Sequence, residues 1–258
     1  MNRQVHATAL VDPSAELGQG VEIGPFAIIG PRCILGDGVS IAARATLECN
    51  VRLAAEVRIG TGSILGGAPQ DLKFGGEETW VDIGPRTVVR EYATINRGTR
   101  ATGATTVGAD GFIMTYVHIA HDCRIGDGVI IANGTQLAGH VTIEDRAILS
   151  GLVAVHQFVK IGAHAFIGGA TRVNQDVPPF VKAVGNPVEL YGLNSIGMSR
   201  HGVAPSTVAA LKRAYRLFFN SDLNIGQALE RARSEMPDLP EVAHFVAFVS
   251  ASERGVPT

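Results

Sequence analysis

The sequence has few of the residues that mark several common classes of protein. Its three cysteines, Cys33, Cys49 and Cys123, suggest no disulfide framework, which fits a reducing compartment, and we expect a cytoplasmic location. The net charge is only −2, so nothing global points to nucleic acid or a membrane surface. There is no run of about 18 apolar residues to span a bilayer. We expect no signal peptide, because the repeat described next already begins at Val5.

What the sequence has instead is a six-residue repeat of aliphatic side chains, supported by 31 glycines for its many turns. The period fits neither a helix nor a plain strand, but it is that of a hexapeptide β-helix, in which each repeat is one short strand and a turn. Chance alignment in a generic all-β domain is a poor alternative, because the register holds so long. The repeated positions are Val5, Val11, Leu17, Ile23, Ile29, Leu35, Ile41, Leu47, Leu53, Ile59, Leu65, Ile83, Val89, Ile95, Val107, Ile113, Ile119, Ile125, Ile131, Leu137, Ile143, Leu149, Val155, Ile161, Ile167 and Val173.

Three repeats would close one triangular coil, and successive coils would stack with strand-like hydrogen bonds about 4.8 Å apart. Four residues after each aliphatic the side chain is usually small, as at Ala27 and Val39, so large and small groups can alternate inside a narrow core. Glycine often follows the aliphatic, where it permits unusual backbone angles or close approaches. Spacing does not give the handedness, and a right-handed β-helix with longer repeats is the second interpretation.

Two segments interrupt the repeat, and a third part of the chain abandons it. Residues 66–82 and 97–106 are polar and glycine-rich and are expected to form loops extruded from a coil, a common place for a site. After the breakers near Pro178 and Pro187, helical spacing begins, with segments opening at Pro205, Asn224 and Pro240. We therefore expect a β-helix over 1–190 and a helical domain over 191–258 that caps the last coil.

Several large apolar residues lie away from the inward positions. A prism with flat apolar faces should associate through them, and threefold symmetry is a natural closed arrangement, so we expect a homotrimer. Scattered surface hydrophobes are the alternative explanation. These residues are Ile148, Leu152, Phe158 and Phe166.

A polar cluster stands out in the middle of the repeat. One coil further along the chain, Gly139 falls on His121 and His140 on Asp122. Another coil on, Gln157 follows Gly139 and His156 follows Ala138, so these side chains should meet at one corner of three stacked coils, with His118 nearby. An isolated histidine would more simply be a solvated turn residue, but four histidines in three coils favour a site.

The cluster suggests acyl or proton chemistry without a covalent intermediate. His121 can act as a general base, Asp122 can orient it, and the backbone N–H of Gly139 can stabilise an oxyanion. There is no Gly-x-Ser-x-Gly motif, and the nearby Cys123 is at an inward position. A zinc site on His118 and His121, completed across a subunit boundary as in carbonic anhydrases of this fold, is the competing interpretation.

With these residues in place, the chain resembles the UDP-N-acetylglucosamine O-acyltransferases, which catalyse the first step of lipid A synthesis. The resemblance covers nearly the whole chain, including the loop over 66–82 and the helical tail. It is carried by Gln70-Asp71-Leu72-Lys73, His118-Ile119-Ala120-His121-Asp122-Cys123, Leu137-Ala138-Gly139-His140, Ala154-Val155-His156-Gln157-Phe158 and Gln175-Asp176-Val177-Pro178-Pro179.

The resemblance implies a left-handed β-helix, a trimer with sites between subunits, and no cofactor or metal. The implied reaction moves an (R)-3-hydroxyacyl group from acyl carrier protein to the 3-position of UDP-N-acetylglucosamine, with His121 as base and Gly139 as oxyanion donor. Gly169 falls where the family sets acyl length, and its open groove suggests a chain of about 14 carbons. The implied substrate-binding residues are Asp71, Lys73, His118, His140, His156, Gln157, Asn194 and Arg200.

Three positions depart from the family pattern: Ile196 stands where a glutamate is frequent, and Asn96 and Pro187 where histidines are frequent. They leave open a 3-amino acceptor, which would give an amide instead of an ester. Three more functions compete with this one: the sibling N-acyltransferase, which carries an additional N-terminal domain, a carbonic anhydrase-like metalloenzyme, and a non-catalytic scaffold.

The expected donor protein also predicts a surface. Acyl carrier protein is acidic, so a basic docking surface is expected in the helical tail, or else the cations there belong to ordinary solvated helix faces. The candidates are Lys212, Arg213, Arg216, Arg231 and Arg233.

Overall fold

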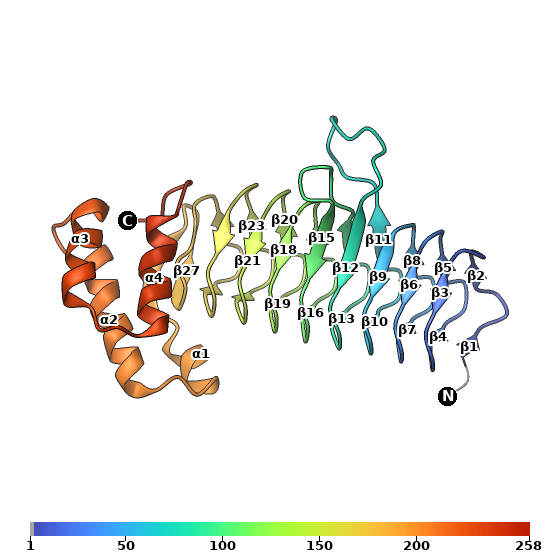
Figure 1. The fold of residues 1–258 in the computed structure, drawn as a ribbon, viewed down its shortest axis with the longest axis horizontal. Coiled ribbons are helices and arrows are strands. Elements are labelled where there is room, and N and C mark those ends of the chain that lie inside the picture. The colour runs from blue at the N-terminus through green and yellow to red at the C-terminus, as the bar shows by residue number, and fades with distance from the viewer. Residues whose placement is uncertain (1–2) are drawn as a thin grey trace.

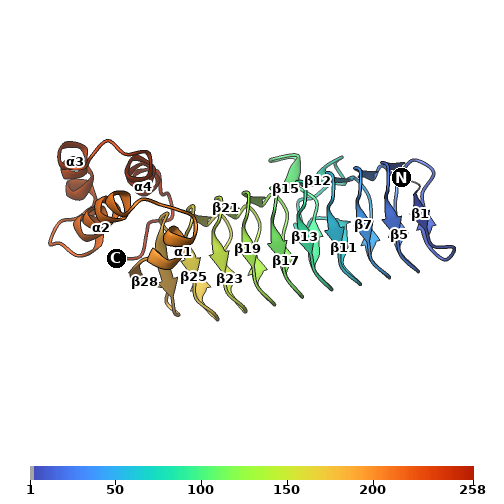
Figure 2. The same ribbon diagram turned by 90° about the horizontal axis from the view of Figure 1, so that it is seen from below.

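The computed structural model describes residues 3–258. The chain winds into a long three-sided prism of short parallel strands, with the N-terminus at one end and a group of helices at the other (Figure 1; Figure 2). From β1 to β23, each strand pairs with the strand three places later in the chain, because three strands and three turns complete one coil.

The strands form three sheets, one on each side of the prism. The first sheet contains β1 (Gln4–Val5), β4 (Glu22–Ile23), β7 (Ser40–Ile41), β10 (Arg58–Ile59), β13 (Val88–Val89), β16 (Phe112–Ile113), β19 (Ile130–Ile131), β22 (Ile148–Leu149), β25 (Phe166–Ile167), β27 (Val181–Val184) and β28 (Glu189–Leu193). The second contains β2 (Leu10–Val11), β5 (Ile28–Ile29), β8 (Thr46–Leu47), β11 (Ile64–Gly67), β14 (Thr94–Asn96), β17 (His118–Ile119), β20 (Gln136–Leu137), β23 (Ala154–Val155) and β26 (Arg172–Val173). The third contains β3 (Glu16–Leu17), β6 (Ile34–Leu35), β9 (Val51–Leu53), β12 (Trp80–Ile83), β15 (Ala104–Val107), β18 (Arg124–Ile125), β21 (Thr142–Ile143) and β24 (Lys160–Ile161).

The core of the prism is the column of repeated aliphatic residues predicted from the sequence. Ile29 is 1% exposed and Leu137 is fully buried, whereas Val5 in the first coil is 45% exposed because no coil lies below it. Small residues such as Ala27 fill the spaces between the large ones. Burial of apolar area at about 25 cal/mol per Å² makes this column the main source of stability.

The turns of the prism make three corners. We call the turns from the first sheet to the second the first corner, those from the second to the third the second corner, and those from the third back to the first the third corner. Most turns place a residue with positive φ three positions after the inward aliphatic, and at the second corner Asp122, His140 and Phe158 have φ of 62°, 62° and 65°. The glycines that follow the aliphatic residues instead allow the backbones of successive coils to approach closely. A Cβ on Gly30 would lie 1.8 Å from the carbonyl oxygen of Glu48.

Two loops leave the prism at the second corner. They occupy residues 68–79 between β11 and β12 and residues 97–103 between β14 and β15. Both are shorter than the spans 66–82 and 97–106 expected from the sequence, because the ends of those spans pair with neighbouring coils. In particular, Trp80–Ile83 pairs with both β9 and β15, so the strand begins three residues before the aliphatic register returns at Ile83.

The prism ends in a hairpin and helices. β27 and β28 are antiparallel, which the sequence did not indicate, and within residues 3–258 four helices follow: α1 (Ser195–Arg200), α2 (Pro205–Phe219), α3 (Ile225–Glu235) and α4 (Pro240–Ser250). Prolines occupy the first turns of α2 and α4, and Asn224 forms a capping box with Gln227 at α3. None of these helices is both long and apolar enough to cross a membrane. We propose that the boundary between the β-helix and the helical domain lies near residue 190, as expected from the sequence. The last strand, β28, pairs with β27 as far as Leu193, and the first helix begins at Ser195.

Candidate active site

The predicted polar cluster does assemble at the second corner. Ile119 pairs with Leu137 and Leu137 with Val155, so the turns that follow these residues lie in register on three successive coils. One column of the corner holds His121, Gly139 and Gln157, and the adjacent column holds Asp122, His140 and Phe158. The repeat thus converts equal spacing along the chain into contact in space.

His121 and Asp122 form a hydrogen-bonded pair. The Nδ1 atom of His121 lies 2.7 Å from Oδ2 of Asp122, and the two side chains are 12% and 0% exposed. Burial alone would raise the pKa of Asp122, but hydrogen bonds from Thr102, His121 and Thr99 lower it below its ordinary value. Because an ionised carboxylate only accepts hydrogen bonds, His121 donates through Nδ1, and in the neutral form of the ring the lone pair is on Nε2.

Gly139 lies directly against the imidazole of His121. A Cβ at residue 139 would be 2.6 Å from Cε1 and 2.8 Å from Nε2 of His121, so a side chain there would displace the ring. Proline occupies the equivalent turn position at Pro13 and Pro25, which shows that the coil does not need this N–H for its own hydrogen bonds. Among residues 3–258, the N–H of Gly139 has no acceptor and remains available beside His121.

Aromatic contacts fix the neighbouring ring of His140. It stacks on Phe158 with centroids 4.5 Å apart and planes 11° apart, and it stands perpendicular to His121 at 5.2 Å. Its Nε2 lies 3.6 Å from Oδ2 of Asp122. The sequence predicts Phe158 only as an apolar surface residue; the structure places it in the histidine cluster.

The other predicted residues of this corner surround the same pair. His118 is on β17, with Nδ1 2.7 Å from Oγ1 of Thr94, and its pKa is lowered by burial and by the nearby His121. His156 follows β23, with its Nδ1 3.1 Å from the carbonyl oxygen of Gln157.

Asp71 and Lys73 lie on the loop 68–79, which leaves the prism at this same corner (Figure 1). The Lys73 N–H donates to Oδ1 of Asp71 at 2.9 Å, and the Lys73 side chain is exposed. Oδ1 of Asp71 therefore stabilises the turn of the loop at Lys73, and Oδ2 of Asp71 takes no part in this hydrogen bond.

Three predicted site residues lie at other corners of the same chain. Asn194 caps α1 at the third corner: its Nδ2 donates to the carbonyl oxygen of His164 and its Oδ1 accepts from Gly197 N–H. Arg200 is exposed at the end of α1, and Gly169 is exposed at the first corner. The structure of a single chain does not bring these three residues to His121.

Sequence reasoning missed two threonines on the loop 97–103. The N–H and Oγ1 of Thr99 and the Oγ1 of Thr102 all donate to the carboxylate of Asp122. The only available signal was the small, threonine-rich composition of that loop, which predicts a turn but not a partner.

The metal alternative also centres on this corner. Within the described residues, ligand atoms of His121, Asp122 and His140 lie within 4.8 Å of one another, a set that Zn²⁺ can use. His118, which the metal interpretation invoked, is outside this group. Both oxygens of Asp122 already accept hydrogen bonds, so a cation would have to displace them.

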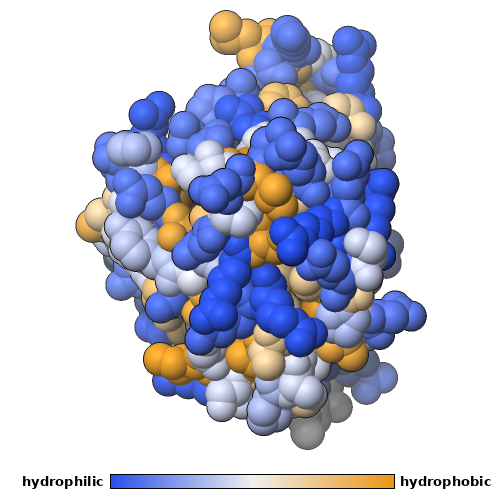
Figure 3. All heavy atoms as spheres, turned by 90° about the vertical axis from the view of Figure 1, so that its left-hand side faces the viewer, coloured by the Kyte–Doolittle hydropathy of each residue, from blue (hydrophilic) through white to orange (hydrophobic). Residues whose placement is uncertain are grey.

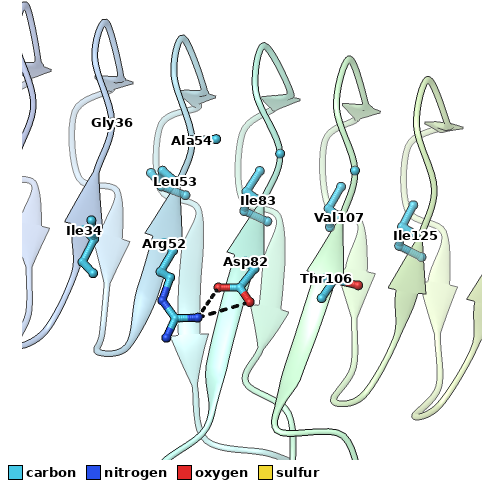
Figure 4. A pocket seen from close by; sticks show the side chains of 12 residues that line it. Ile34, Gly36, Arg52, Leu53, Ala54, Asp82, Ile83, Thr106, Val107 and Ile125 are labelled. Atoms are coloured by element: carbon cyan, nitrogen blue, oxygen red, sulfur yellow. Dashed lines mark hydrogen bonds and ion pairs between the residues drawn. The ribbon is translucent and has the colours of Figure 1, made fainter.

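A separate hollow of about 510 Å³ lies on the outer face of the third sheet. Figure 4 shows the Arg52–Asp82 ion pair there, with the partly exposed Ile34 and Thr106 on neighbouring strands of the sheet. Its lining contains no imidazole or thiol, so it offers no base or nucleophile comparable to His121.

Comparison with known proteins gives consistent results. A family described as UDP-N-acetylglucosamine O-acyltransferase, domain 2, matches residues 176–257, and the hexapeptide repeat of bacterial transferases matches residues 14–49 and 104–139. The acyl-[acyl-carrier-protein]–UDP-N-acetylglucosamine O-acyltransferases of Verminephrobacter eiseniae and Alkalilimnicola ehrlichii are 48% and 44% identical to the chain; each match covers 98% of both proteins.

Solved structures agree. The UDP-N-acetylglucosamine acyltransferase of Bacteroides fragilis superposes with a TM-score of 0.96 at 38% identity, covering 99% of this chain and 100% of that one. The Francisella novicida enzyme gives 0.94 at 35% identity, covering 98% and 94%. These matches confirm the expected left-handed parallel β-helix with a helical C-terminal end. The chain therefore belongs to the UDP-N-acetylglucosamine O-acyltransferase family and is an acyltransferase.

Proposed function

We propose that this protein transfers an (R)-3-hydroxyacyl group from acyl carrier protein to the 3-position of UDP-N-acetylglucosamine, as the first step of lipid A synthesis. The names of the relatives support the assignment of acyl carrier protein as the acyl donor and of UDP-N-acetylglucosamine as the acceptor. The observation that carries the chemistry is the His121–Asp122 pair, which lies against Gly139, whose N–H donates no hydrogen bond within the described residues.

In the proposed reaction His121 is the general base. Its Nε2 takes the proton of the sugar hydroxyl while the hydroxyl oxygen bonds to the thioester carbonyl carbon. The carbonyl oxygen becomes an oxyanion, which the N–H of Gly139 stabilises, and Asp122 stabilises the imidazolium. Collapse of the oxyanion breaks the carbon–sulfur bond, and the leaving thiolate receives the proton from His121. A positioned base contributes about 10²–10⁴-fold and an oxyanion donor roughly 2.7–4 kcal/mol.

The surroundings of Cys123 support direct transfer without a covalent intermediate. This thiol follows Asp122 in sequence but points into the core, where Sγ contacts the carbonyl oxygen of Ala138 at 3.2 Å. Burial raises the pKa of Cys123 to about 12, so a thiolate is not populated near neutral pH. A direct attack by the sugar hydroxyl is then the simplest route.

Substrate binding is assigned mainly to the second corner. We propose that Asp71, His118, His140, His156 and Gln157 hold the sugar, and that Lys73 meets the acyl chain or the pantetheine arm from its exposed place on the loop. These residues lie on three coils and one loop around His121, which suits a ligand with several hydroxyl groups. No cofactor or metal is part of the proposal.

A trimer would bring the remaining residues to the site. Exposed apolar side chains line the first corner along the prism, with Phe26 at 59%, Tyr92 at 48%, Tyr116 at 61% and Leu152 at 71%. If three first corners met at a threefold axis, the second sheet of each subunit would face the first sheet of the next. The second corner of one subunit would then lie beside the third corner of its neighbour.

That arrangement supports roles for the three residues that lie far from His121 in one chain. Asn194 and Arg200 of a neighbouring subunit would reach the nucleotide, where the guanidinium suits a diphosphate. Asn194 would bind through the part of its amide hydrogen-bonding capacity that its bonds to His164 and Gly197 leave unused. Gly169 would border the acyl groove, and its lack of a side chain suits a long chain of about 14 carbons, as the family resemblance implies. A Cβ there would lie 3.5 Å from the carbonyl oxygen of Gly151, which is ordinary contact, so a larger residue could shorten the groove.

The helical end is the proposed landing surface for acyl carrier protein. Figure 3 looks onto this end and shows many hydrophilic side chains around smaller apolar patches. The acidic carrier would be attracted by exposed cations on α2 and α3. These are Lys212, Arg213, Arg216, Arg231 and Arg233, of which Arg231 is paired with Glu235.

The test is a transfer assay with the purified protein and 3-hydroxyacyl carrier proteins of several chain lengths. Each donor is offered UDP-N-acetylglucosamine and, separately, its 3-amino analogue, because Asn96, Pro187 and Ile196 leave the acceptor open. Transfer should occur and should fall by about 10²–10⁴-fold in His121→Ala. His6→Ala is the matched control, since His6 is an exposed histidine in the first coil. Absence of transfer to both acceptors by the folded protein would overturn the proposal, and metal analysis would then test the zinc alternative.

A further inference from the structure

The loop 97–103 closes over the carboxylate of Asp122. The Asp122 side chain has no exposed surface, although it lies at a corner of the prism. Its Oδ1 accepts the Thr99 N–H at 2.9 Å and the Thr102 hydroxyl, and its Oδ2 accepts the Thr99 hydroxyl at 2.9 Å. The loop is therefore a cover that supplies hydrogen-bond donors where water is absent.

The loop has the rigidity that such a role needs. Gly103 N–H donates to the carbonyl oxygen of Thr99 at 2.8 Å, which closes a single turn, and Trp80 N–H donates to the carbonyl oxygen of Gly103 at 2.9 Å. The Oγ1 of Thr99 also accepts the N–H of Ala101 at 3.2 Å, so the proton of that hydroxyl is directed to Asp122. These contacts fix the side chain of Thr99, whereas the single hydroxyl proton of Thr102 has two acceptors, Oδ1 of Asp122 and the carbonyl oxygen of Ala104 at 2.9 Å.

The donors decide how Asp122 meets His121. A carboxylate buried without donors would take up a proton or turn toward water. The three donors from the loop fill the outer sides of both oxygens, which leaves Oδ2 oriented toward Nδ1 of His121 at 2.7 Å. Hydrogen bonds to a charged group are individually strong, and a network of them acts as one unit.

We propose that Thr99 and Thr102 are positioning residues for the reaction: they keep Asp122 ionised and oriented, so that His121 donates through Nδ1 and offers Nε2 as the base. This inference rests on the proposed function. Neither threonine touches the substrate; both act through Asp122. The loop 97–103 is thereby assigned a role in catalysis in addition to its place at the second corner.

The first experiment removes each hydroxyl with little change of shape. Thr99→Val and Thr102→Val should each lower kcat by about tenfold or more, with the KM for UDP-N-acetylglucosamine changed by less than about twofold, because a hydrogen bond to a charged group is lost. The acid limb of the kcat–pH profile should move to higher pH, since the buried carboxylate protonates more easily. Thr99→Ser keeps the hydroxyl and should restore kcat.

A matched control is available at another corner. The hydroxyl of Thr115 donates to Oε2 of Glu91 at 3.0 Å, so Thr115→Val also removes a threonine–carboxylate bond. This variant should keep both kcat and the pH profile. Retention of kcat and of the acid limb in both Thr99→Val and Thr102→Val would overturn the proposal.

A double-mutant cycle separates positioning from general damage to the fold. In an Asp122→Asn background the threonine substitutions should cause no further loss of kcat, because the group through which they act is gone. An equal loss in both backgrounds contradicts the proposal. Thermal unfolding of each variant shows whether the fold is retained.

A measurement that does not depend on enzyme activity tests the positioning role separately from the proposed function. In protein with ¹⁵N-labelled histidine, the Nδ1 proton of His121 should give a downfield NMR resonance that moves or is lost in Thr99→Val and Thr102→Val but not in Thr115→Val. If the wild type transfers no acyl group, the proposed function fails and this resonance alone decides. An unchanged resonance in both variants would overturn the positioning role.

Discussion

The imidazole of His121 occupies the space that a side chain at Gly139 would need. A Cβ on Gly139 would approach Cε1 of His121 to 2.6 Å. The absence of a side chain at residue 139 is therefore what admits the imidazole ring of the proposed base at this place.

Gly139→Ala should therefore impair catalysis more than folding. The methyl group would displace the ring of His121, and kcat should fall by about 10²-fold or more, the scale of a lost general base. Gly226→Ala in α3 is the matched control, since Gly226 lies outside the proposed site and a Cβ there meets its nearest neighbour, Oδ1 of Asn224, at 3.3 Å. Wild-type kcat in Gly139→Ala, measured in the transfer assay, would contradict the assigned geometry.

Thiol modification should leave the activity intact. Burial raises the pKa of Cys33 to about 11 and that of Cys123 to about 12, and both side chains are fully buried, so the native protein should react with iodoacetamide only at the half-buried Cys49. Mass spectrometry after labelling at pH 8, with and without denaturant, counts the modified residues. Rapid labelling of native Cys123 with loss of transfer would revive a covalent mechanism.

His244 should make stability depend on pH near neutrality. Its Nε2 lies 2.7 Å from Oε2 of Glu144, and this hydrogen bond raises the pKa of His244 above its ordinary value of 6.5 despite partial burial. The charged form is favoured in the folded state, so the stabilisation is complete below pH 6.5 and disappears as the pH rises through the higher folded pKa. The side chain is 42% exposed, so solvent screening limits the effect to about 1 kcal/mol or less.

The measurement is the difference in Tm between wild type and His244→Gln across pH 5.5 to about 8.5. The wild type should be the more stable protein at the acid end, and the difference should vanish at the alkaline end. A difference that grows with pH would show that the pair is not ionised as inferred. His6→Gln controls for the loss of an exposed histidine.

Asn194 should affect stability through its cap before it affects binding. Its amide joins α1 to the third corner, so Asn194→Ala should lower the free energy of unfolding by about 0.5–2 kcal/mol. Asn194→Asp keeps the acceptor for Gly197 N–H and should recover much of this loss. A rise in KM for the nucleotide sugar in the stable Asp variant supports the additional role at the nucleotide, and an unchanged KM in both variants leaves only the cap.

Leu152→Glu should dissociate the trimer that we propose. Leu152 is 71% exposed at the first corner, and a carboxylate there would be buried without a partner at the threefold axis. Light scattering should report a mass near three times 27.1 kDa for the wild type and a smaller one for the variant. Leu72→Glu, at a fully exposed leucine on the loop 68–79, should leave the mass unchanged. A wild-type monomer would refute the threefold arrangement.

The local pattern of the sequence determined the prism. Because the backbone repeats every six residues, the aliphatic register alone predicted the core, and equal spacing predicted that His121, Gly139 and Gln157 would stack. Proline and capping signals likewise predicted helices beginning near Pro205, Asn224 and Pro240. Before Ile83, where the aliphatic register is interrupted, the pairing of Trp80–Ile83 with the neighbouring coils still forms a strand.

Only the tertiary structure decided what lies across the corners. Nothing in the spacing of Thr99 and Thr102 points to Asp122, because the loop that carries them leaves the register and folds back through hydrogen bonds of its own. Nor does spacing show that Phe158 stacks on His140, or that Asn194 is tied to His164 at a different corner from His121. A periodic sequence fixes neighbours along the axis of the prism, whereas contacts made by loops and helices depend on side-chain directions that no period encodes.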